Sequence, residues 1–360
     1  MPRAVIQWIF VAGLAAAGAC LGMACGSETS GTADSSGTST ASGQGGNGGS
    51  SASNGGNATS SSSTGGSVEE VKVAFLGDSA NGVGFIANLN LIKSEGADFV
   101  FHEGDFDYGE QPLPFWATVD QILGHDYPYL LAVGNHDDGA WVGYAEHMTE
   151  HMTANGIVVD DPDHSDEMWA ATYKGLKLVA VGQRNNENAA KQAFIEAQLD
   201  AADPSWKICN WHKNQSAMQI GGKGNEMGWG VYETCRQKGA LIITGHEHSY
   251  SRTKTLTDME NQVVDGTCSD PNELCVGPGR TFAVVSGLGG VGVRDQERCF
   301  PTTPPYGCNG EWAMIYAEQQ NAKYGTMFIT FNAGGDPKKA TGYFKNIDGD
   351  IIDSFEITKD

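Results

Sequence analysis

Five short polar segments, each directly after or at the end of an apolar run, carry side chains that could bind a metal ion or a phosphate. In chain order they are Gly77-Asp78-Ser79-Ala80, Gly104-Asp105-Phe106-Asp107-Tyr108, Gly134-Asn135-His136-Asp137, Asn210-Trp211-His212 and Gly245-His246-Glu247-His248. Their candidate ligands are Asp78, Asp105, Tyr108, Asn135, His136, His212, His246 and His248. Carboxylate and phenolate oxygens suit a hard trivalent ion, whereas imidazoles and an amide oxygen suit a divalent ion. Two ions bridged by one carboxylate would clamp a phosphate ester and hold a hydroxide in line for attack.

The positions of these segments predict the elements that must hold them. Apolar runs at residues 71–77, 98–102, 129–133, 206–210 and 241–244 are typical of strands, and helical patterns at residues 188–202 and 230–238 lie among them. Strands that alternate with helices indicate an α/β sandwich built of βαβ units. Because ligands of open α/β sheets bind beyond the carboxyl ends of the strands, we expect the five segments to converge. A glycine before the key residue permits a sharp exit from the strand.

The C-terminal part predicts further strands, at residues 280–286, 312–318, 326–332, 340–346 and 351–357, with a hairpin turn at Asp348-Gly349. The chain has 360 residues, of which 40% are hydrophobic, so it is long enough for one large domain or two average ones. We expect residues 68–360 to form the catalytic domain.

The net charge excludes one class of partner. The chain has 22 Lys and Arg against 44 Asp and Glu, which gives a net charge of −22. Such a chain repels polyanions, so no nucleic-acid polymer is expected as a partner, and the sequence indicates no protein partner either. A small phosphate ester remains a possible substrate because bound metal ions would dominate the local field.

The first 67 residues predict export. Residues 1–25 have the layout of a secretory signal segment, with Arg3 before an apolar run. Leu21-Gly22-Met23-Ala24-Cys25 resembles a bacterial lipoprotein cleavage box, which makes Cys25 the expected lipidation site; cleavage at Cys20 and a retained anchor are the alternatives. In residues 26–67, Gly, Ser and Thr make up 32 of 42 residues, as in a flexible tether. We expect a cell-envelope lipoprotein that meets the membrane only through its lipid, or a secreted protein.

Six further cysteines suggest disulfides in an exported chain. Cys268 with Cys275 and Cys299 with Cys308 would close short loops, which leaves Cys209 with Cys235 by elimination. Six cysteines allow 15 connectivities, and free buried thiols are the alternative.

The motifs resemble those of the calcineurin-like metallophosphoesterase superfamily, and most closely those of its purple acid phosphatase branch. The superfamily places a metal-binding His two residues after the first Asp, where this chain has Ala80; the branch uses instead a tyrosinate in the second motif, and Tyr108 is there. The segments 245–252 (GHEHSYSR) and 286–290 (SGLGG) are also similar to that branch. The resemblance implies a metallophosphoesterase-type α/β/β/α sandwich of two mixed sheets flanked by helices.

The resemblance also implies roles for the candidate residues. A first metal, Fe³⁺, would be bound by Asp78, Asp105, Tyr108 and His248. A second, divalent ion (Fe²⁺, Zn²⁺ or Mn²⁺) would be bound by Asp105, Asn135, His212 and His246. His136 would contact the phosphate and protonate the leaving oxygen while a metal-bound hydroxide attacks a phosphate monoester.

The sequence departs from the branch after the fourth motif, where Lys213-Asn214-Gln215 replaces further histidines that grip the phosphate. Lys213 could bind the anion as a cation instead. A phosphodiesterase or nucleotidase is therefore an alternative, and an inactive surface-binding domain is an alternative of another class.

Three further features could carry chemistry of their own. His147-Met148-Thr149-Glu150-His151 fits H-x-x-E-H, a zinc-peptidase signature, but we interpret residues 142–155 as an exposed polar helix. The acidic segment 160–167 is interpreted as a solvated loop. His102 and Glu103 precede the second motif closely enough to support its ligands.

Overall fold

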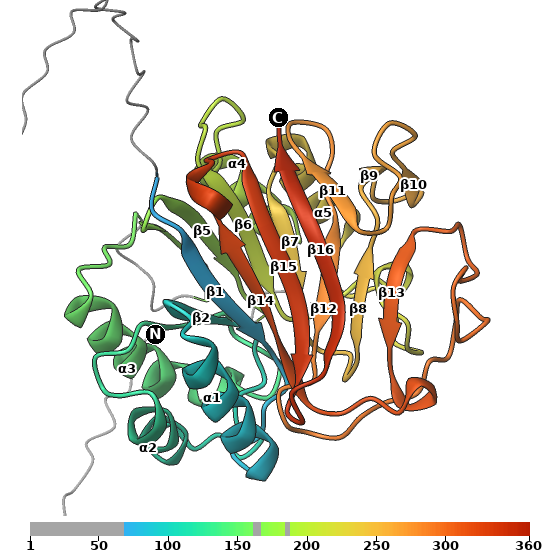
Figure 1. Ribbon diagram of the computed structural model, residues 1–360. Coiled ribbons are helices and arrows are strands. Elements are labelled where there is room, and N and C mark those ends of the chain that lie inside the picture. Colours follow the sequence, from blue (N-terminus) through green and yellow to red (C-terminus); the bar gives the residue numbers. More distant parts are fainter. Residues whose placement is uncertain (1–67, 161–166, 184–187) are drawn as a thin grey trace, which may run out of the picture. The chain divides into compact units, whose positions relative to one another are not determined.

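Two seven-stranded mixed sheets form the folded part of the chain and pack face to face, with helices on their outer sides (Figure 1). The computed structural model describes residues 68–160, 167–183 and 188–360. The expected signal segment, Cys25, the tether and most of the acidic segment 160–167 lie outside the described residues. The predicted α/β/β/α sandwich is confirmed.

The first sheet combines the strands that begin the folded part with those that end it. Its spatial order is β11 (Glu273–Val276), β16 (Ile351–Lys359), β15 (Lys339–Asn346), β14 (Gly325–Phe331), β1 (Val71–Leu76), β2 (Phe99–His102) and β3 (Tyr129–Leu131). β1, β2 and β3 are parallel, and β1 pairs antiparallel with β14. The carboxyl ends of β1 to β3 therefore meet at one edge of the sheet.

The second sheet has the same mixed character. Its order is β13 (Trp312–Tyr316), β8 (Tyr250–Thr253), β12 (Ala283–Ser286), β7 (Leu241–Thr244), β6 (Trp206–Trp211), β5 (Leu176–Val181) and β4 (Trp169–Tyr173). β5, β6, β7 and β12 are parallel neighbours. A separate two-stranded ribbon contains β9 (Leu256–Asp258) and β10 (Val263–Val264).

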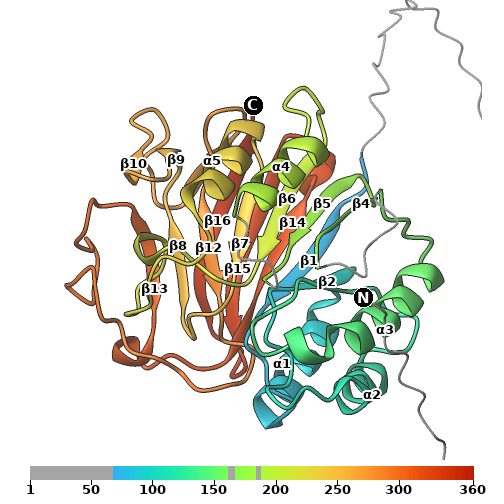
Figure 2. The same ribbon diagram turned by 180° about the vertical axis from the view of Figure 1, so that it is seen from behind.

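Helices flank both sheets, but on the first sheet the helices that the structure describes leave the outer faces of β15 and β16, which carry exposed residues, without a helix over them (Figure 1). α1 (Val83–Glu95), α2 (Pro112–Ile122) and α3 (Trp141–Ala154) lie beside the first sheet, and α4 (Asn188–Gln198) and α5 (Trp229–Lys238) lie against the second (Figure 2). α4 ends earlier than the predicted residue 202. Asp200 Oδ1 accepts the Ala202 N–H at 2.9 Å and Asp203 Oδ1 accepts the Ser205 N–H at 2.8 Å, so local side-chain hydrogen bonds replace the helical ones.

The central strands are mostly apolar because both of their faces are covered. In β7, Ile243 packs into the core between the two sheets, while its neighbour Ile242 packs into the core beneath α4 and α5. Ile208 and Cys209 of β6 divide in the same way. This arrangement explains why these strands appear in the sequence as mostly apolar runs without a strict alternation of polar residues.

The three predicted disulfides are confirmed. Cys209 of β6 is bonded to Cys235 of α5, and the pairs Cys268–Cys275 and Cys299–Cys308 close loops with sequence separations of 7 and 9. Disulfides form and persist in oxidising compartments, which favours an exported protein. Within the described residues, no helix has both the length and the apolar character needed to cross a membrane.

The interpretation of residues 142–155 as an exposed helix is wrong in one respect. The helix is present as α3, but one of its faces is buried and includes Tyr144, Met148 and Met152. His151 shares that face and is 1% exposed, whereas His147 and Glu150 lie on the more open side. The two histidines of the H-x-x-E-H motif therefore have different surroundings.

Candidate metal centre

The five polar segments converge, as predicted, at the carboxyl ends of strands from both sheets. They follow β1, β2 and β3 of the first sheet and β6 and β7 of the second. Four of the predicted ligands have left-handed backbones: φ is 58° at Asp78, 57° at Asp105, 58° at Tyr108 and 71° at His246. This conformation is uncommon for residues other than glycine and concentrates at functional sites. The loops thus hold their ligands at some cost in backbone energy.

Two glycines allow the loops after β2 and β3 to approach each other. Gly104 has a φ of 92°. A Cβ atom at Gly134 would lie 2.2 Å from both the backbone nitrogen and Oδ1 of Asp105, which no real Cβ tolerates. Gly134 is therefore required because backbone and ligand occupy the space of a side chain.

A first group of donor atoms contains Asp78, Tyr108 and His248. The Tyr108 hydroxyl lies 3.1 Å from Asp78 Oδ1 and 3.1 Å from His248 Nε2. His248 Nε2 is in turn 3.4 Å from Asp78 Oδ1. Three donors that face one another at these distances could share one ion.

A second group contains Asp105, His212 and His246, whose donor atoms all lie within 4.8 Å of one another. His212 Nε2 is 3.1 Å from Asp105 Oδ2 and 3.1 Å from His246 Nδ1. The two groups are adjacent, since His212 Nε2 is also 3.9 Å from Asp78 Oδ1. Asn135 Oδ1 is buried and finds no hydrogen-bond partner in the part of the chain that the structure describes, as expected for an oxygen whose partner is an ion.

The outer nitrogens of both histidines are held by acceptors. His212 Nδ1 donates to the Glu103 carbonyl oxygen at 2.7 Å, and His246 Nε2 donates to Glu226 Oε2 at 2.9 Å. Metal-binding histidines are usually oriented in this way, because the bond fixes the tautomer and leaves the other nitrogen free. Glu226 was not predicted: it lies in an irregular loop 20 residues before His246 and has no motif of its own.

The charges of the site attract cations. Burial raises the pKa of Tyr108, and the nearby carboxylates of Asp78 and Asp105 raise it further, so the phenol ionises only if a cation offsets them. Burial opposes protonation of His212, but Asp105 and Asp78 outweigh it and raise its pKa to about 9. The donor chemistry, the unpartnered Asn135 oxygen and this excess of negative charge fit metal ions.

Asp137 joins the loops that carry the ligands. Its Oδ2 accepts the N–H groups of Asp105 and Gly134, both at 2.7 Å, and its Oδ1 accepts the Phe106 N–H at 2.8 Å. The carboxylate is completely buried. Asp137 lies within one of the predicted motifs, but the sequence did not predict this role. The available signal was its position three residues after Gly134, the glycine that follows β3.

The predicted substrate residues lie at the margin of the centre. His136 is exposed, its N–H donates to Asp105 Oδ1 at 2.9 Å, and its ring centroid is 4.6 Å from that of Tyr108. Lys213 Nζ is 3.3 Å from Glu226 Oε1, so this lysine is already paired with the carboxylate that holds His246. A second cation, Lys223, donates to the His246 carbonyl oxygen.

His102 forms hydrogen bonds with the two loops that follow β1 and β2. It accepts the Gly104 N–H at Nδ1 (3.1 Å), so Nε2 carries the proton and donates to Ser79 Oγ at 2.9 Å. Ser79 Oγ donates to the Phe106 carbonyl oxygen at 2.6 Å. Burial outweighs the attraction of nearby carboxylates and lowers the pKa of His102 to about 3, so the ring is neutral. The expectation that His102 supports the second motif agrees with these contacts.

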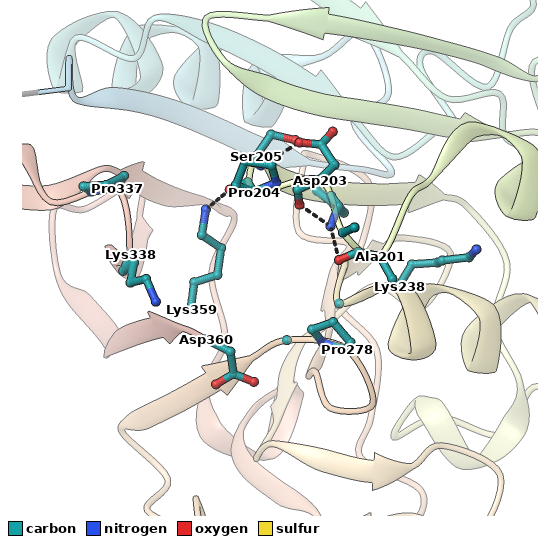
Figure 3. Close-up of a pocket in the computed structure, with 14 residues that line it drawn as sticks. Ala201, Asp203, Pro204, Ser205, Lys238, Pro278, Pro337, Lys338, Lys359 and Asp360 are labelled. Carbon is teal, nitrogen blue, oxygen red and sulfur yellow. Dashed lines mark hydrogen bonds between the residues drawn. The ribbon is translucent and has the colours of Figure 1, made fainter.

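A lysine-lined pocket of about 450 Å³ lies away from this centre (Figure 3). Its cationic residues are Lys207, Lys238, Lys338 and Lys359. The loop at residues 201–205 that precedes β6 contributes to it, so it lies at the opposite end of that strand from His212. Its residues are separate from those of the metal centre.

Comparisons with known proteins agree with this geometry. Residues 71–250 match the family model of calcineurin-like phosphoesterases. No curated protein sequence matches the chain. The fold is similar to that of purple acid phosphatase PPD1 from yellow lupin (Lupinus luteus) seeds, with a TM-score of 0.56 and 17% identity over 81% of this chain and 54% of that one. It is also similar to GAP50, the anchor in the inner membrane complex of Plasmodium, with a TM-score of 0.50 and 13% identity over 80% of this chain and 89% of that one. The chain thus spans about half the length of the lupin enzyme.

Proposed function

This chain belongs to the calcineurin-like phosphoesterase family of metal-dependent hydrolases, and from this premise we propose that it hydrolyses phosphate monoesters at a dinuclear centre. One observation carries the proposal: two groups of donor atoms lie side by side, 3.9 Å apart at His212 Nε2 and Asp78 Oδ1. The similarity in fold to the lupin purple acid phosphatase and the pairing of Ala80 with Tyr108 in the sequence favour that branch of the family.

The residues divide into two ligand sets. Asp78, Asp105, Tyr108 and His248 would hold Fe³⁺, and Asp105, Asn135, His212 and His246 would hold a divalent ion. Two bound ions would supply positive charge for the phosphate and lower the pKa of a water molecule near them. Asp105 belongs to both sets, so its carboxylate would be a ligand of both ions.

The remaining residues of the site would act on the substrate. His136 is exposed at the margin of the centre and is free to donate a proton to the leaving oxygen. The ammonium groups of Lys213 and Lys223 would draw an anionic ester toward the centre, and Lys213 also holds Glu226 against His246. A small substrate fits this arrangement better than a polymer, since the chain as a whole carries −22.

Metal analysis together with a visible spectrum tests the proposed iron site. Tyrosinate bound to Fe³⁺ gives a charge-transfer colour, so we expect the purified protein to be coloured and to contain two metal ions per chain. Tyr108→Phe removes the phenolate while it keeps the ring that packs beside His136. We expect this variant to be bleached. A colourless wild-type protein without stoichiometric metal would refute the dinuclear iron centre.

We expect His136→Ala to reduce kcat on aryl phosphate by about 100-fold, because general acid catalysis contributes roughly that factor or more. Its side chain is in neither ligand set, so the variant should keep its metal content and colour. The reduction should be smaller for substrates with acidic leaving groups, which need less protonation. An equal loss with every leaving group would contradict the acid role.

Two other functions make different predictions in the same assays. A phosphodiesterase or nucleotidase would cleave bis-aryl phosphate faster than aryl phosphate, and the replacement of phosphate-gripping histidines by Lys213 and its neighbours favours this alternative. An inactive surface-binding domain, with the fold that GAP50 also has, would cleave neither. Every proposed metal ligand is present, which favours an enzyme.

The location of the protein is proposed separately. The three disulfides support an exported protein, and the lipid attachment at Cys25 and the tether at residues 26–67 would place the catalytic domain at the cell envelope. Cys25→Ser should release the protein from the membrane fraction without change in its rate on aryl phosphate.

A further inference from the structure

A second group of side chains that could bind a metal ion lies between α2 and α3, which run side by side next to the first sheet (Figures 1 and 2). It contains Asp120 near the end of α2, His125 in the loop that follows, and His151 in the last turn of α3. Their donor atoms lie within 4.8 Å of one another. None of these residues belongs to the catalytic centre.

His151 is oriented as a metal ligand. Its Nδ1 lies 2.6 Å from the Tyr127 carbonyl oxygen, and because a carbonyl can only accept, Nδ1 must carry the proton. The other nitrogen, Nε2, then faces Asp120 Oδ1 at 3.1 Å. A backbone carbonyl that holds the outer N–H is the usual support of a metal-bound histidine.

Asp120 Oδ1 shows that this contact is not an ordinary hydrogen bond. The atom is buried and has no hydrogen-bond partner among the described residues, although His151 Nε2 is only 3.1 Å away. An oxygen and a nitrogen that meet in this way, without an aligned proton, are arranged like two ligands of one ion. Ligand atoms of a tetrahedral zinc ion lie about 3.3 Å apart, given bonds of about 2.0 Å.

His125 completes the group from the solvent side. Its Nδ1 is 3.1 Å from Asp120 Oδ2, and 63% of its side chain is exposed. The carboxylates of Asp126 and Glu150 add negative charge around Asp120 and His125, so this surface attracts cations.

The surroundings hold the three residues in place. Asn155 Nδ2 donates to the carbonyl oxygens of Asp126 and His151, both at 2.8 Å, and so fastens the loop after α2 to the end of α3. The Trp116 ring packs on the His151 ring with centroids 4.6 Å apart. A site that is held rigid before binding loses little entropy when an ion enters.

We propose that Asp120, His125 and His151 bind a zinc ion that ties α2 and the loop after it to α3. Two imidazoles and one carboxylate are a common zinc donor set, and the exposed side leaves a position for water. The H-x-x-E-H motif is thereby divided: His151 serves this site, while His147 pairs with Glu150 at 3.0 Å. The motif therefore does not form a peptidase centre.

The test compares zinc content between variants. The full chain, loaded with the ions of its catalytic centre, is dialysed against zinc, and the metals bound per chain are counted by plasma mass spectrometry. We expect His125→Ala and Asp120→Asn each to lose one zinc ion per chain relative to wild type. His147→Ala is the matched control, since this histidine lies on the same helix outside the group, and it should bind as much zinc as wild type. His151 is avoided because its removal would leave a buried cavity.

Thermal unfolding gives a second readout that is independent of activity. Added zinc should raise the unfolding midpoint of wild type and His147→Ala, and should have a smaller effect on His125→Ala. All four proteins should hydrolyse aryl phosphate at similar rates. Equal zinc content in wild type, His125→Ala and Asp120→Asn would overturn the proposal, as would an equal loss in His147→Ala.

Discussion

Replacement of Asp105 by Asn should lower kcat/KM on a phosphate ester by at least about 1000-fold, which corresponds to ~4 kcal/mol of lost transition-state stabilisation. The carboxylate is the one that both proposed ligand sets share: Oδ2 is 3.1 Å from His212 Nε2, and Oδ1 accepts the His136 N–H at 2.9 Å. An amide has nearly the same shape but is neutral. It would leave two adjacent cations without the charge that offsets their repulsion, so metal content should fall with activity.

Asp107→Asn is the matched control for this change. Asp107 lies in the same loop, and its carboxylate accepts the N–H groups of Gly109 and Gln111 at 2.9 and 2.8 Å. The control makes the same change of charge two residues away, outside both ligand sets, and we expect less than a ten-fold effect. If Asp105→Asn kept both metal ions and a rate within ten-fold of wild type, Asp105 would not be the shared ligand.

Much of this site could be predicted because its ligands follow strands that are recognisable in the sequence. β1, β6 and β7 consist mostly of apolar residues, so their ends are clear, and Asp78, His212 and His246 come within two residues of those ends. Because these strands run parallel within each sheet, their ends bring the residues together, and this could be predicted without knowledge of side-chain contacts. The short loop disulfides could be inferred for a similar reason, since sequence proximity limits which cysteines can meet.

The unpredicted residues are those whose role depends on the path of a loop. Glu226 reaches His246 from an irregular segment, and no periodic pattern fixes where such a segment passes. Asp120, His125 and His151 belong to two helices and a connecting loop, so their proximity follows from helix packing. The prediction of an exposed helix at residues 142–155 was wrong for the same reason, because the sequence did not show that β3 and α2 would cover one face of α3.

Asp137→Ala should be the most destabilising single change at the centre, with a loss of about 3 kcal/mol in the free energy of unfolding. The substitution leaves three N–H groups without a partner, those of Asp105, Phe106 and Gly134, in a site that water does not reach. Each buried donor left unpaired costs about 1–3 kcal/mol, and relaxation of the loops would recover part of the sum. Since the same N–H groups set the position of Asp105, activity should fall at least 100-fold as well.

Asp137→Asn distinguishes the loss of these three hydrogen bonds from a general effect of substitution at this position. Its carbonyl oxygen can take the place of Oδ2 and accept from Asp105 and Gly134, but its NH₂ group must then face the Phe106 N–H. We therefore expect a stability between those of wild type and Asp137→Ala. Urea unfolding with a chelator present measures the contribution of these hydrogen bonds to the free energy of unfolding, because metal binding then adds nothing to the stability of the folded state. If the three proteins unfolded at the same urea concentration, the loops would be held by contacts other than Asp137, and the left-handed backbone of Asp105 would need another support.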